Sequence, residues 1–327
     1  MNYRKFPLSG WQVSEIGLGT WQLGADWGMV EEPVANNILE ASLAAGINFF
    51  DTADVYGLGL SEIRIRNFLK NHKDTVYVAT KLGRFPKPGW PENFSLEAFR
   101  THTENSLRRL GVEALDLTQV HCLPTEVLQN GEVFDWLREL KREGKIKQFG
   151  FSVESMEEAE LCLQQEGVAS LQIIFNILRQ KPATLLFDKA MQKGVALIVR
   201  LPLASGLLSG KMNSASKFPK DDHRNYNRDG QQFNVGETFA GLPFKKGVEL
   251  TTELQSLLPE GMTLSQMAMR WILDHPAVTV AIPGATQPEQ VRSNASASDL
   301  PRLDDALLKK LEHFYQEKVH SHIRGKY

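Results

Sequence analysis

The sequence has little of what membrane and secreted proteins need. Its 327 residues include only two cysteines, Cys122 and Cys162, which are too few for a disulfide framework and suit a reducing compartment. No apolar run approaches the roughly 20 residues that span a bilayer. The N-terminal segment MNYRKFPLSGWQVSE lacks the apolar core of a signal peptide. We therefore expect a cytoplasmic protein with no membrane association.

An excess of charge of one sign is also missing. Lys and Arg number 37, Asp and Glu number 39, and the formal net charge is -2. No basic field is present to hold nucleic acid. Hydrophobic residues make up 42% and charged residues 23%, which excludes a disordered or fibrous chain. The sequence is that of a globular protein, and an enzyme is the leading class.

Eight short apolar runs, most of them continuously apolar, are typical of strands buried on both faces. They begin at Ile16, Ile47, Val76, Leu115, Ile146, Leu171, Val195 and Val278. The segments between them have helical periodicity, shown by Val133, Trp136, Leu137 and Leu140 at i, i+3, i+4 and i+7. Eight such β–α units predict a (β/α)8 barrel, with residues 1–327 as a single domain. A doubly wound open sheet is the second choice, disfavoured by the strand count and by the lack of G-x-G-x-x-G after the first strand.

Three additions to the plain barrel are predicted. Residues 5–15 form an N-terminal β-hairpin that plugs the bottom of the barrel. Residues 202–244, rich in Gly, Ser, Asn and Asp, form a long functional loop after the seventh strand. Extra helices are expected over residues 246–257 and 303–317.

Polar residues at the strand ends indicate the chemistry, because barrel enzymes place catalytic groups there. Asp51, Lys81 and His121 end the second, third and fourth predicted strands, and Tyr56 follows Asp51. A tyrosine is a weak acid at neutral pH, but a neighbouring ammonium lowers the pKa of its hydroxyl. Tyr56 is thus the expected proton donor, Lys81 its tuner, Asp51 the partner of Lys81, and His121 the residue that orients the substrate oxygen. None of these side chains supplies hydride, so reduction needs a cofactor.

Seven motifs, in order along nearly the whole chain, make the sequence resemble the aldo-keto reductase family. They are GTW from Gly19, DTADVYG from Asp51, ATK from Ala79, VH from Val120, GFS from Gly150, PLASGLLSGK ending at Lys211 and IPGA ending at Ala285. The resemblance implies NAD(P)H-dependent reduction of aldehydes and ketones without a metal, and it places the family's catalytic tetrad on Asp51, Tyr56, Lys81 and His121. The histidine favours carbonyl reduction over the double-bond reduction seen when glutamate replaces it.

The resemblance also implies a cofactor site. Its residues here are Thr20, Trp21, Asp51, Ser152, Gln172, Arg200, Leu203, Ser205, Gly206, Lys211, Gly284, Thr286, Gln290 and Asn294. Ser152 and Gln172 would bind the nicotinamide carboxamide, but Val153 stands where many members have an asparagine. Arg200 stands where many have a tyrosine that stacks on the nicotinamide, and a guanidinium plane can also stack on a ring. A substrate anion or a phosphate is the alternative ligand of Arg200.

NADP(H) is the expected cofactor, with NAD(H) as the alternative. Recognition of a 2′-phosphate needs cationic groups. Many mammalian members have Lys and Arg at the positions of Gly284 and Gln290, and neither residue is basic here. Lys211, Arg224 and Arg292 are the candidate substitutes.

The expected partner is a small carbonyl substrate. The predicted pocket consists of Trp21, Trp27, Tyr56, Phe85 and His121. No metal is expected, because Asp51 and Asp54 have no His or Glu at ligand spacing. Nothing in the sequence demands an interface, so a monomer or weak homo-oligomer is predicted.

Two other functions stay open. The first is a cofactor-binding sensor or regulatory subunit with little turnover, like the potassium-channel β-subunits that share the fold. The second is a non-redox barrel enzyme, such as an isomerase or lyase, that uses Lys81 and Asp51. Taken singly, Asp51 and Lys81 also fit a structural ion pair, His121 a core histidine, and Tyr56 a rim aromatic.

Overall fold

Eight parallel strands form the centre of the molecule. The computed structural model describes residues 1–24 and 30–327. Within them the strands neighbour one another in chain order, from β3 to β10. They are β3 (Leu18–Gly19), β4 (Phe49–Asp51), β5 (Tyr77–Leu82), β6 (Leu115–His121), β7 (Ile146–Ser152), β8 (Val168–Ile174), β9 (Ala196–Arg200) and β10 (Val278–Ala281). Each coincides with one of the eight predicted strands, so the predicted strand set is confirmed.

Main-chain bridges between the first and last strands close the sheet into a barrel. Ile16 bridges Ala281, and Gly19 bridges Gly284, both in parallel orientation. The approach is close enough that a Cβ on Gly19 would lie 2.8 Å from the carbonyl oxygen of Ile282. Glycine is therefore required at this contact. The predicted (β/α)8 barrel is confirmed.

Inward-facing positions change from apolar to polar along the strands. Side chains two residues apart point to the same face of a strand. Phe49, Ala79 and Leu117 belong to the apolar cluster inside the barrel. Two residues further along, the same face carries Asp51, Lys81 and Gln119, all buried. The core thus ends, at the carboxyl ends of the strands, in a layer of buried polar groups.

The N-terminal hairpin fills the other end of the barrel. It consists of β1 (Tyr3–Lys5) paired antiparallel with β2 (Gln12–Ser14). Phe6 and Val13 are fully buried in the interior cluster, and the Phe6 ring lies 6.4 Å from that of Phe49. The predicted plug is confirmed, and only the carboxyl end of the barrel is left for a site.

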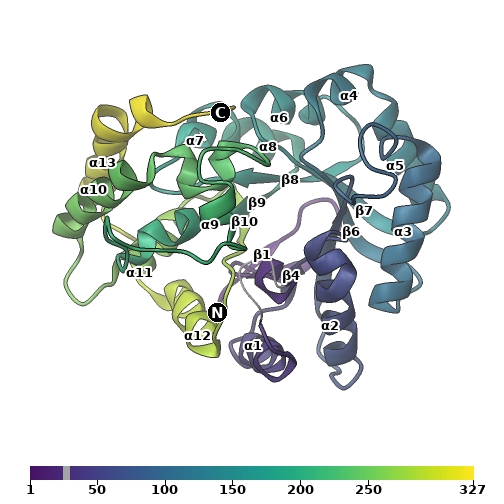
Figure 1. Cartoon of the computed structure of the whole chain (residues 1–327), viewed down its shortest axis with the longest axis horizontal. Coiled ribbons are helices and arrows are strands. Elements are labelled where there is room, and N and C mark those ends of the chain that lie inside the picture. Colours follow the sequence, from purple (N-terminus) through teal and green to yellow (C-terminus); the bar gives the residue numbers. More distant parts are fainter. Residues whose placement is uncertain (25–29) are drawn as a thin grey trace.

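A layer of helices surrounds the strands (Figure 1). The helices that follow the barrel strands are α1 (Glu32–Ala44), α2 (Leu60–Leu69), α3 (Leu96–Leu110), α4 (Thr125–Asn130), α5 (Glu132–Arg142), α6 (Met156–Leu163), α7 (Lys181–Leu185), α8 (Phe187–Lys193), α11 (Leu264–Leu273) and α12 (Pro288–Ser296). Helix α1 lies against α12, so this layer closes on itself as the barrel does.

The predicted additions after the seventh barrel strand are present. Between β9 and β10 the chain forms α9 (His223–Tyr226), α10 (Phe244–Leu254) and α11, joined by 3-10 turns, and α13 (Asp305–Phe314) follows the barrel. The helix predicted over 246–257 ends at Leu254 and continues as a 3-10 turn. The helix predicted over 303–317 begins at Asp305, because the Asp304 side chain caps it by accepting from the Leu307 amide at 2.7 Å.

Within the described residues, none of the helices combines the length and apolar character needed to cross a bilayer.

Candidate active site

The four residues of the predicted catalytic set meet at the carboxyl ends of three neighbouring strands. Asp51 ends β4, Lys81 lies near the end of β5, and His121 ends β6. Tyr56 opens a 3-10 turn, Tyr56–Gly59, five residues after Asp51. Its ring centre lies 6.0 Å from that of His121, at an interplanar angle of 83°. The fold thus brings together residues that lie up to 70 positions apart in the sequence.

Lys81 is the centre of this group. Its side chain is fully buried. The ammonium donates hydrogen bonds to Asp51 Oδ1, to the Thr52 carbonyl oxygen at 2.9 Å and to the Tyr56 hydroxyl at 3.2 Å. All three ammonium donors therefore have acceptors. Burial alone would lower the pKa of Lys81, but Asp51 and Tyr56 outweigh burial and raise it, so the side chain stays charged.

The pKa of Tyr56 differs from the sequence-based expectation. Lys81 does lower the pKa of the phenol, as predicted, but burial raises it by more, and the Asp51 carboxylate raises it further. The net pKa lies above the ordinary value of 10.0. The expectation of a lowered pKa is wrong, because burial of the ring is a property of the folded chain that the sequence pattern does not display. Tyr56 accordingly holds its proton in the ligand-free protein.

His121 is neutral at physiological pH. Burial lowers its pKa well below 6.5, and the cations of Arg84, Lys81 and Arg200 lower it further. Its Nδ1 is buried and has no hydrogen-bond partner among the described residues. A neutral imidazole can donate one hydrogen bond to a carbonyl oxygen without adding charge to the site.

The second carboxylate oxygen of Asp51 is held by two glutamines. Gln119 Nε2 donates to Asp51 Oδ2 at 3.0 Å, and Gln172 Nε2 donates to the same oxygen at 2.7 Å. Gln172 Nε2 also lies 3.2 Å from Gln119 Oε1. The sequence analysis had named Gln172 and not Gln119. Counting back two residues from His121 along the inward face of β6 would have found it.

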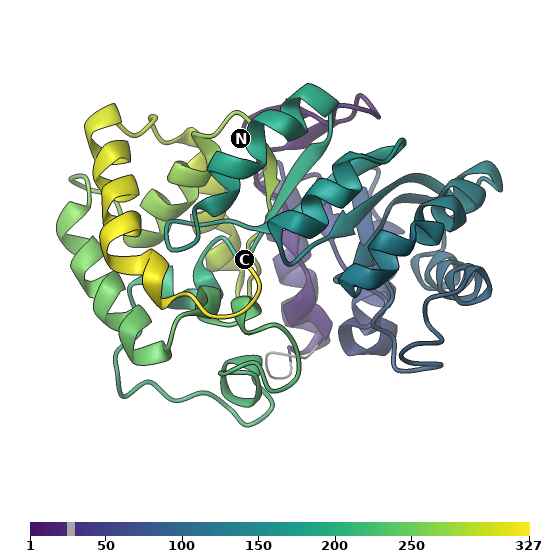
Figure 2. The same ribbon diagram turned by 90° about the horizontal axis from the view of Figure 1, so that it is seen from above.

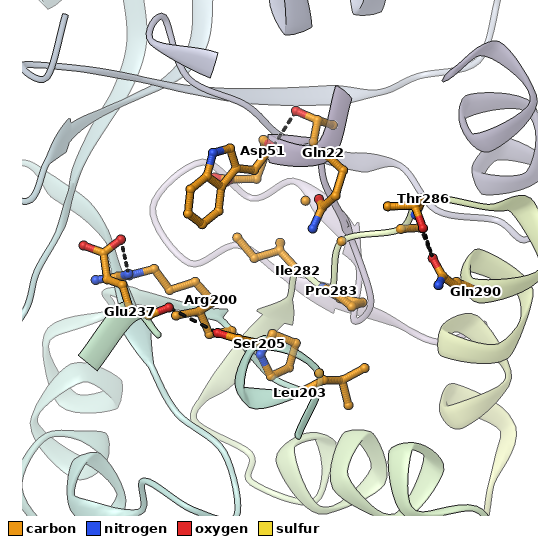
Figure 3. Close-up of a pocket in the computed structure, with 18 of the residues that line it drawn as sticks. Gln22, Asp51, Arg200, Leu203, Ser205, Glu237, Ile282, Pro283, Thr286 and Gln290 are labelled. Carbon is orange, nitrogen blue, oxygen red and sulfur yellow. Dashed lines mark hydrogen bonds and ion pairs between the residues drawn. The ribbon is translucent and has the colours of Figure 1, made fainter. Parts of the chain in front are cut away.

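A cavity of about 720 Å³ opens beside these residues. Its volume lies within the roughly 300–1,000 Å³ typical of small-molecule sites. Most of the predicted site residues line it, namely Thr20, Trp21, Asp51, Tyr56, His121, Gln172, Arg200, Leu203, Ser205, Gly206, Lys211, Gly284, Thr286, Gln290 and Asn294. The lining continues from the catalytic set past the segment after β9 to the beginning of α12 (Figure 3).

Four predicted site residues are not placed in this lining. Lys81 lies behind it, fully buried. The Ser152 hydroxyl is buried 3.5 Å from Cys122 Sγ, although Ser152 had been expected to contact the cofactor. Phe85 had been expected in the substrate pocket, but its ring centre lies 5.7 Å from that of His102 on α3, and it is the preceding residue, Arg84, that lines the cavity. Trp27 lies outside the described residues.

A charged cluster that the sequence analysis missed forms one wall of the cavity. Arg84 Nη2 contacts Glu237 at 3.0 Å and Glu154 at 3.1 Å, and Arg200 Nη1 lies 3.3 Å from Glu237. Figure 3 shows Arg200 beside Glu237. Burial alone would raise the pKa of Glu237, but the two guanidinium groups outweigh burial and lower it. Glu237 comes from the long segment after β9, so no local pattern predicts its partners.

The same carboxylates could be considered for a cation. Cys122, Glu154 and Glu237 each place a ligand atom within 4.8 Å of the others. Arg84 and Arg200 already neutralise both carboxylates, and burial raises the pKa of the Cys122 thiol to about 11. A metal ion would have to displace two guanidinium groups and bind a thiol whose raised pKa opposes ionisation.

The segment after β9 is strained where it borders the cavity. Leu201, Ala204 and Ser205 have φ values of 53°, 49° and 55°. Non-glycine residues in this left-handed region cost on the order of 1–3 kcal/mol each and cluster at ligand sites. The Ser205 hydroxyl accepts from the Phe239 amide at 3.1 Å, which ties this segment to the long insertion.

A buried amide faces the middle of the cavity. Gln22 is 8% exposed, and its Oε1 has no hydrogen-bond partner among the described residues. It lies directly over Gly284, where an added Cβ would come within 2.2 Å of Gln22 Oε1. Buried carbonyl oxygens are rarely left unpaired, so this group is suited to accept from a bound molecule.

The far end of the cavity is polar and of mixed charge. Gln290 Oε1 accepts from the Thr286 amide at 2.7 Å and from the Thr286 hydroxyl at 3.2 Å, and Figure 3 shows the contact between the two side chains. Glu289 also lines this end and pairs with Arg292 at 2.6 Å. Lys211 lines the cavity and forms no ion pair with a carboxylate among residues 1–24 and 30–327. Arg292 was one of the cations suggested for a 2′-phosphate. It is therefore already paired with an acid that lines the cavity.

A closed barrel with a Tyr-Lys-Asp-His group at its strand ends, beside a cavity of this size, defines a class of barrel oxidoreductases. Residues 15–316 match the model of the Aldo/keto reductase family, and the chain belongs to this family. The resemblance drawn from the seven motifs is thereby confirmed.

Named relatives and solved structures are similar to this chain over nearly its full length. The chain is 30% identical to aldo-keto reductase YhdN of Bacillus subtilis, over 90% of this chain and 87% of that one. It is also 30% identical to the NADH-specific methylglyoxal reductase of Escherichia coli, over 93% and 95% of the two chains. The glycerol dehydrogenase AKR11B4 of Gluconobacter oxydans superposes with a TM-score of 0.78 at 28% identity, covering 99% and 98%.

Proposed function

We propose that the protein is a nicotinamide-dependent reductase of aldehyde and ketone carbonyls, with Tyr56 as the general acid. The observation that carries this proposal is the contact of Tyr56 with Lys81 at 3.2 Å, at the inner end of a cavity of about 720 Å³. Two similar proteins have the matching chemistry in their names, one as a methylglyoxal reductase and one as a glycerol dehydrogenase. Carbonyl reduction and alcohol oxidation are the two directions of one reaction.

The residues around the cavity fit a nicotinamide dinucleotide. The strained turn at Leu201–Ser205 and the side-chain-free surface at Gly284 each suit a large polar ligand lying against the backbone. The Gln22 oxygen, which has no partner in the part of the chain that the structure describes, suits such a ligand as well. Lys211 lines the cavity and offers a cation for a phosphate. When bound, the reduced nicotinamide supplies the hydride that the carbonyl carbon receives.

Arg200 is proposed to lie against the nicotinamide in place of the tyrosine common in the family. Its guanidinium is fixed by Glu237 at 3.3 Å and by the Val153 carbonyl oxygen at 3.4 Å, while its buried Nε has no partner among the described residues. Pairing with Glu237 neutralises the cation, which weakens the alternative that Arg200 holds a substrate anion. A planar guanidinium held in this way can stack on a ring.

NADP(H) is the proposed form of the cofactor, on the family resemblance and on Lys211. The carboxylate of Glu289 favours NAD(H) instead, because it would repel a 2′-phosphate at the same end of the cavity. One similar protein is named NADH-specific. A direct comparison of the dissociation constants of NADPH and NADH tests this proposal.

The proton for the product alcohol comes from Tyr56 in this account. His121, neutral, donates a hydrogen bond to the carbonyl oxygen and holds it near the Tyr56 hydroxyl. As negative charge develops on that oxygen, Tyr56 transfers its proton, and the Lys81 ammonium 3.2 Å away stabilises the phenolate left behind. Asp51 keeps Lys81 charged throughout.

Replacement of Tyr56 tests the assignment. Tyr56→Phe keeps the ring, and thus its contact with Trp21 at 5.9 Å, while it removes the transferable proton. Steady-state turnover with a panel of aldehydes should fall by about 10²-fold or more, and the dissociation constant of the cofactor should stay within about twofold of the wild-type value. Retained turnover in this variant would overturn the assignment of the acid.

A further inference from the structure

We propose that Gln119 is a positioning residue that couples the acid–base group to the cofactor site. In this inference Gln119 fixes the direction of the Gln172 amide and holds the Asp51 carboxylate in place beside Lys81. It rests on the proposed function, because the direction of Gln172 matters only to a bound nicotinamide.

Gln119 lies between Asp51 and Gln172 and contacts both side chains. It is the register partner of Lys81 across β5 and β6, so both side chains point to the barrel interior. Gln119, Gln172 and Asp51 are 0%, 1% and 2% exposed. Because these three side chains are buried, solvent cannot replace a hydrogen bond that is lost between them.

The direction of both amides follows from the chemistry of the carboxylate. An ionised Asp51 can only accept hydrogen bonds, so each glutamine must turn its NH2 group toward it. Gln119 and Gln172 reach Oδ2 at 3.0 Å and 2.7 Å. Gln119 Oε1 then accepts from the same Gln172 nitrogen at 3.2 Å, so both hydrogens of the Gln172 amide have acceptors. Gln172 lines the cavity, and its carbonyl oxygen accepts no hydrogen bond from the residues that the structure describes.

That oxygen is the group a nicotinamide carboxamide needs. The carboxamide NH2 is a donor, and Gln172 can meet it only as an acceptor. Val153 stands where many family members offer an asparagine, so this chain has fewer amide groups for the same contact. Recognition of the carboxamide therefore depends more on the fixed orientation of the Gln172 amide. The Gln119 side chain fixes that orientation.

Gln119 also acts on the acid–base group through Asp51. With the Lys81 ammonium on Oδ1 and two amide donors on Oδ2, the buried carboxylate is fully paired. Loss of the Gln119 donor removes one of the groups that hold this carboxylate in position. A displaced Asp51 carboxylate also displaces Lys81, and with it the environment of the Tyr56 hydroxyl.

The test uses a cofactor analogue in which the carboxamide is replaced by an acetyl group, 3-acetylpyridine adenine dinucleotide phosphate. Wild-type protein should bind NADPH more tightly than the reduced analogue, which lacks the NH2 donor. In Gln119→Met, which keeps the volume and loses both hydrogen bonds, this discrimination should fall by about fivefold, the equivalent of one hydrogen bond of about 1 kcal/mol. The pH profile of kcat should shift as well. A residue with only a structural role would change neither the discrimination nor the profile.

Thr118→Val is the matched control. Thr118 lies on the same strand, is fully buried, and its hydroxyl has no hydrogen-bond partner among the described residues. Its replacement should leave both the discrimination and the pH profile at wild-type values. A change as large as that of Gln119→Met would show that any β6 substitution disturbs the site, and would overturn the assignment to Gln119.

Gln119→Glu serves if the methionine variant fails to fold. When protonated, its carboxyl group can donate to Asp51 as the amide does. When ionised, it repels Asp51. Its activity relative to wild type should be highest at low pH and should fall as pH rises. A constant ratio at all pH values, or analogue discrimination that stays at the wild-type value at high pH, would contradict the inference. If wild-type protein binds neither NADPH nor NADH, the proposed function itself has failed and this inference fails with it.

Discussion

The Lys81 ammonium lies 3.2 Å from the Tyr56 hydroxyl, yet the pKa of Tyr56 stays above its ordinary value. Burial of the ring outweighs the neighbouring charge in the ligand-free protein. The proton is therefore present on Tyr56 before substrate arrives. In the proposed mechanism Lys81 has its effect only when the phenolate forms, because electrostatic stabilisation accelerates a reaction where charge develops in the transition state.

Replacement of Lys81 by an uncharged residue separates its proposed effect on catalysis from its effect on the stability of the fold. Lys81→Met should lower kcat by at least about 10²-fold. It should also reduce the free energy of unfolding by about 3–5 kcal/mol, because Asp51 then remains as an unpaired buried charge. Urea unfolding and steady-state kinetics measure the two effects. The double variant Lys81→Met/Asp51→Asn should regain stability and remain inactive. Full activity in either variant would contradict the proposed role of Lys81.

Lys211 should decide how the two cofactors are distinguished. Lys211→Ala removes the cavity cation that has no carboxylate partner among the described residues. The dissociation constant of NADPH should rise by about tenfold, and that of NADH by less, because only NADPH carries a 2′-phosphate. The matched control is Lys246→Ala, since Lys246 is not among the residues that line the cavity and pairs with Glu249 at 3.0 Å. An equal loss for both cofactors would place the Lys211 contact on the pyrophosphate instead.

His223 should make the fold sensitive to acid. Burial lowers its pKa from 6.5 to about 4. The unfolded chain then binds a proton in a pH range where the folded chain does not, so stability is complete above pH 6.5 and is lost as pH falls toward 4. The loss amounts to about 3 kcal/mol at pH 4, at about 1.4 kcal/mol per pKa unit. Urea unfolding of His223→Gln should show a smaller decrease in stability between pH 7 and pH 4.5. The exposed His322, changed to Gln, is the control and should behave as wild type.

The C-terminal residues should stabilise the segment that carries Glu237. Figure 2 shows the yellow C-terminal tail returning from α13 across the molecule. Arg324 donates to the Gly241 carbonyl oxygen at 3.0 Å and to Asp229 at 2.7 Å. Arg324→Ala should raise the KM for substrate and cofactor several-fold and accelerate proteolytic cleavage within residues 227–242. Arg302→Ala, which removes only an exposed contact with Asp305 at 3.6 Å, is the control. Equal cleavage rates in the two variants would contradict the prediction.

The barrel could be predicted from the sequence because its strands are buried on both faces. That burial demands continuous apolar runs, and each run marks one strand. The proposed catalytic set could be assembled from the sequence for a related reason, since Asp51, Lys81 and His121 end three of these runs. The boundaries of the extra helices were less exact, because a cap such as Asp304 is one residue in a polar stretch.

The remaining features depend on contacts between distant segments. Glu237 meets Arg84 and Arg200 only after the long insertion has folded over the barrel. Whether Arg84 or Phe85 faces the cavity is set by the course of the loop after β5, which has no periodicity to indicate it. The pKa of Tyr56 likewise depends on how deeply its ring is buried.

The most direct test of the account is a titration of NADPH and NADH against tryptophan fluorescence. Trp21 lines the cavity and stacks 5.9 Å from Tyr56, so a bound nicotinamide should quench its emission, and Trp21→Phe should lose most of that signal. We predict saturable binding of both cofactors, tighter for NADPH, followed by turnover with aldehydes. Tight binding with negligible turnover would favour a sensor over an enzyme. Binding of neither cofactor would contradict the proposed reductase and favour a barrel enzyme that works without nicotinamide.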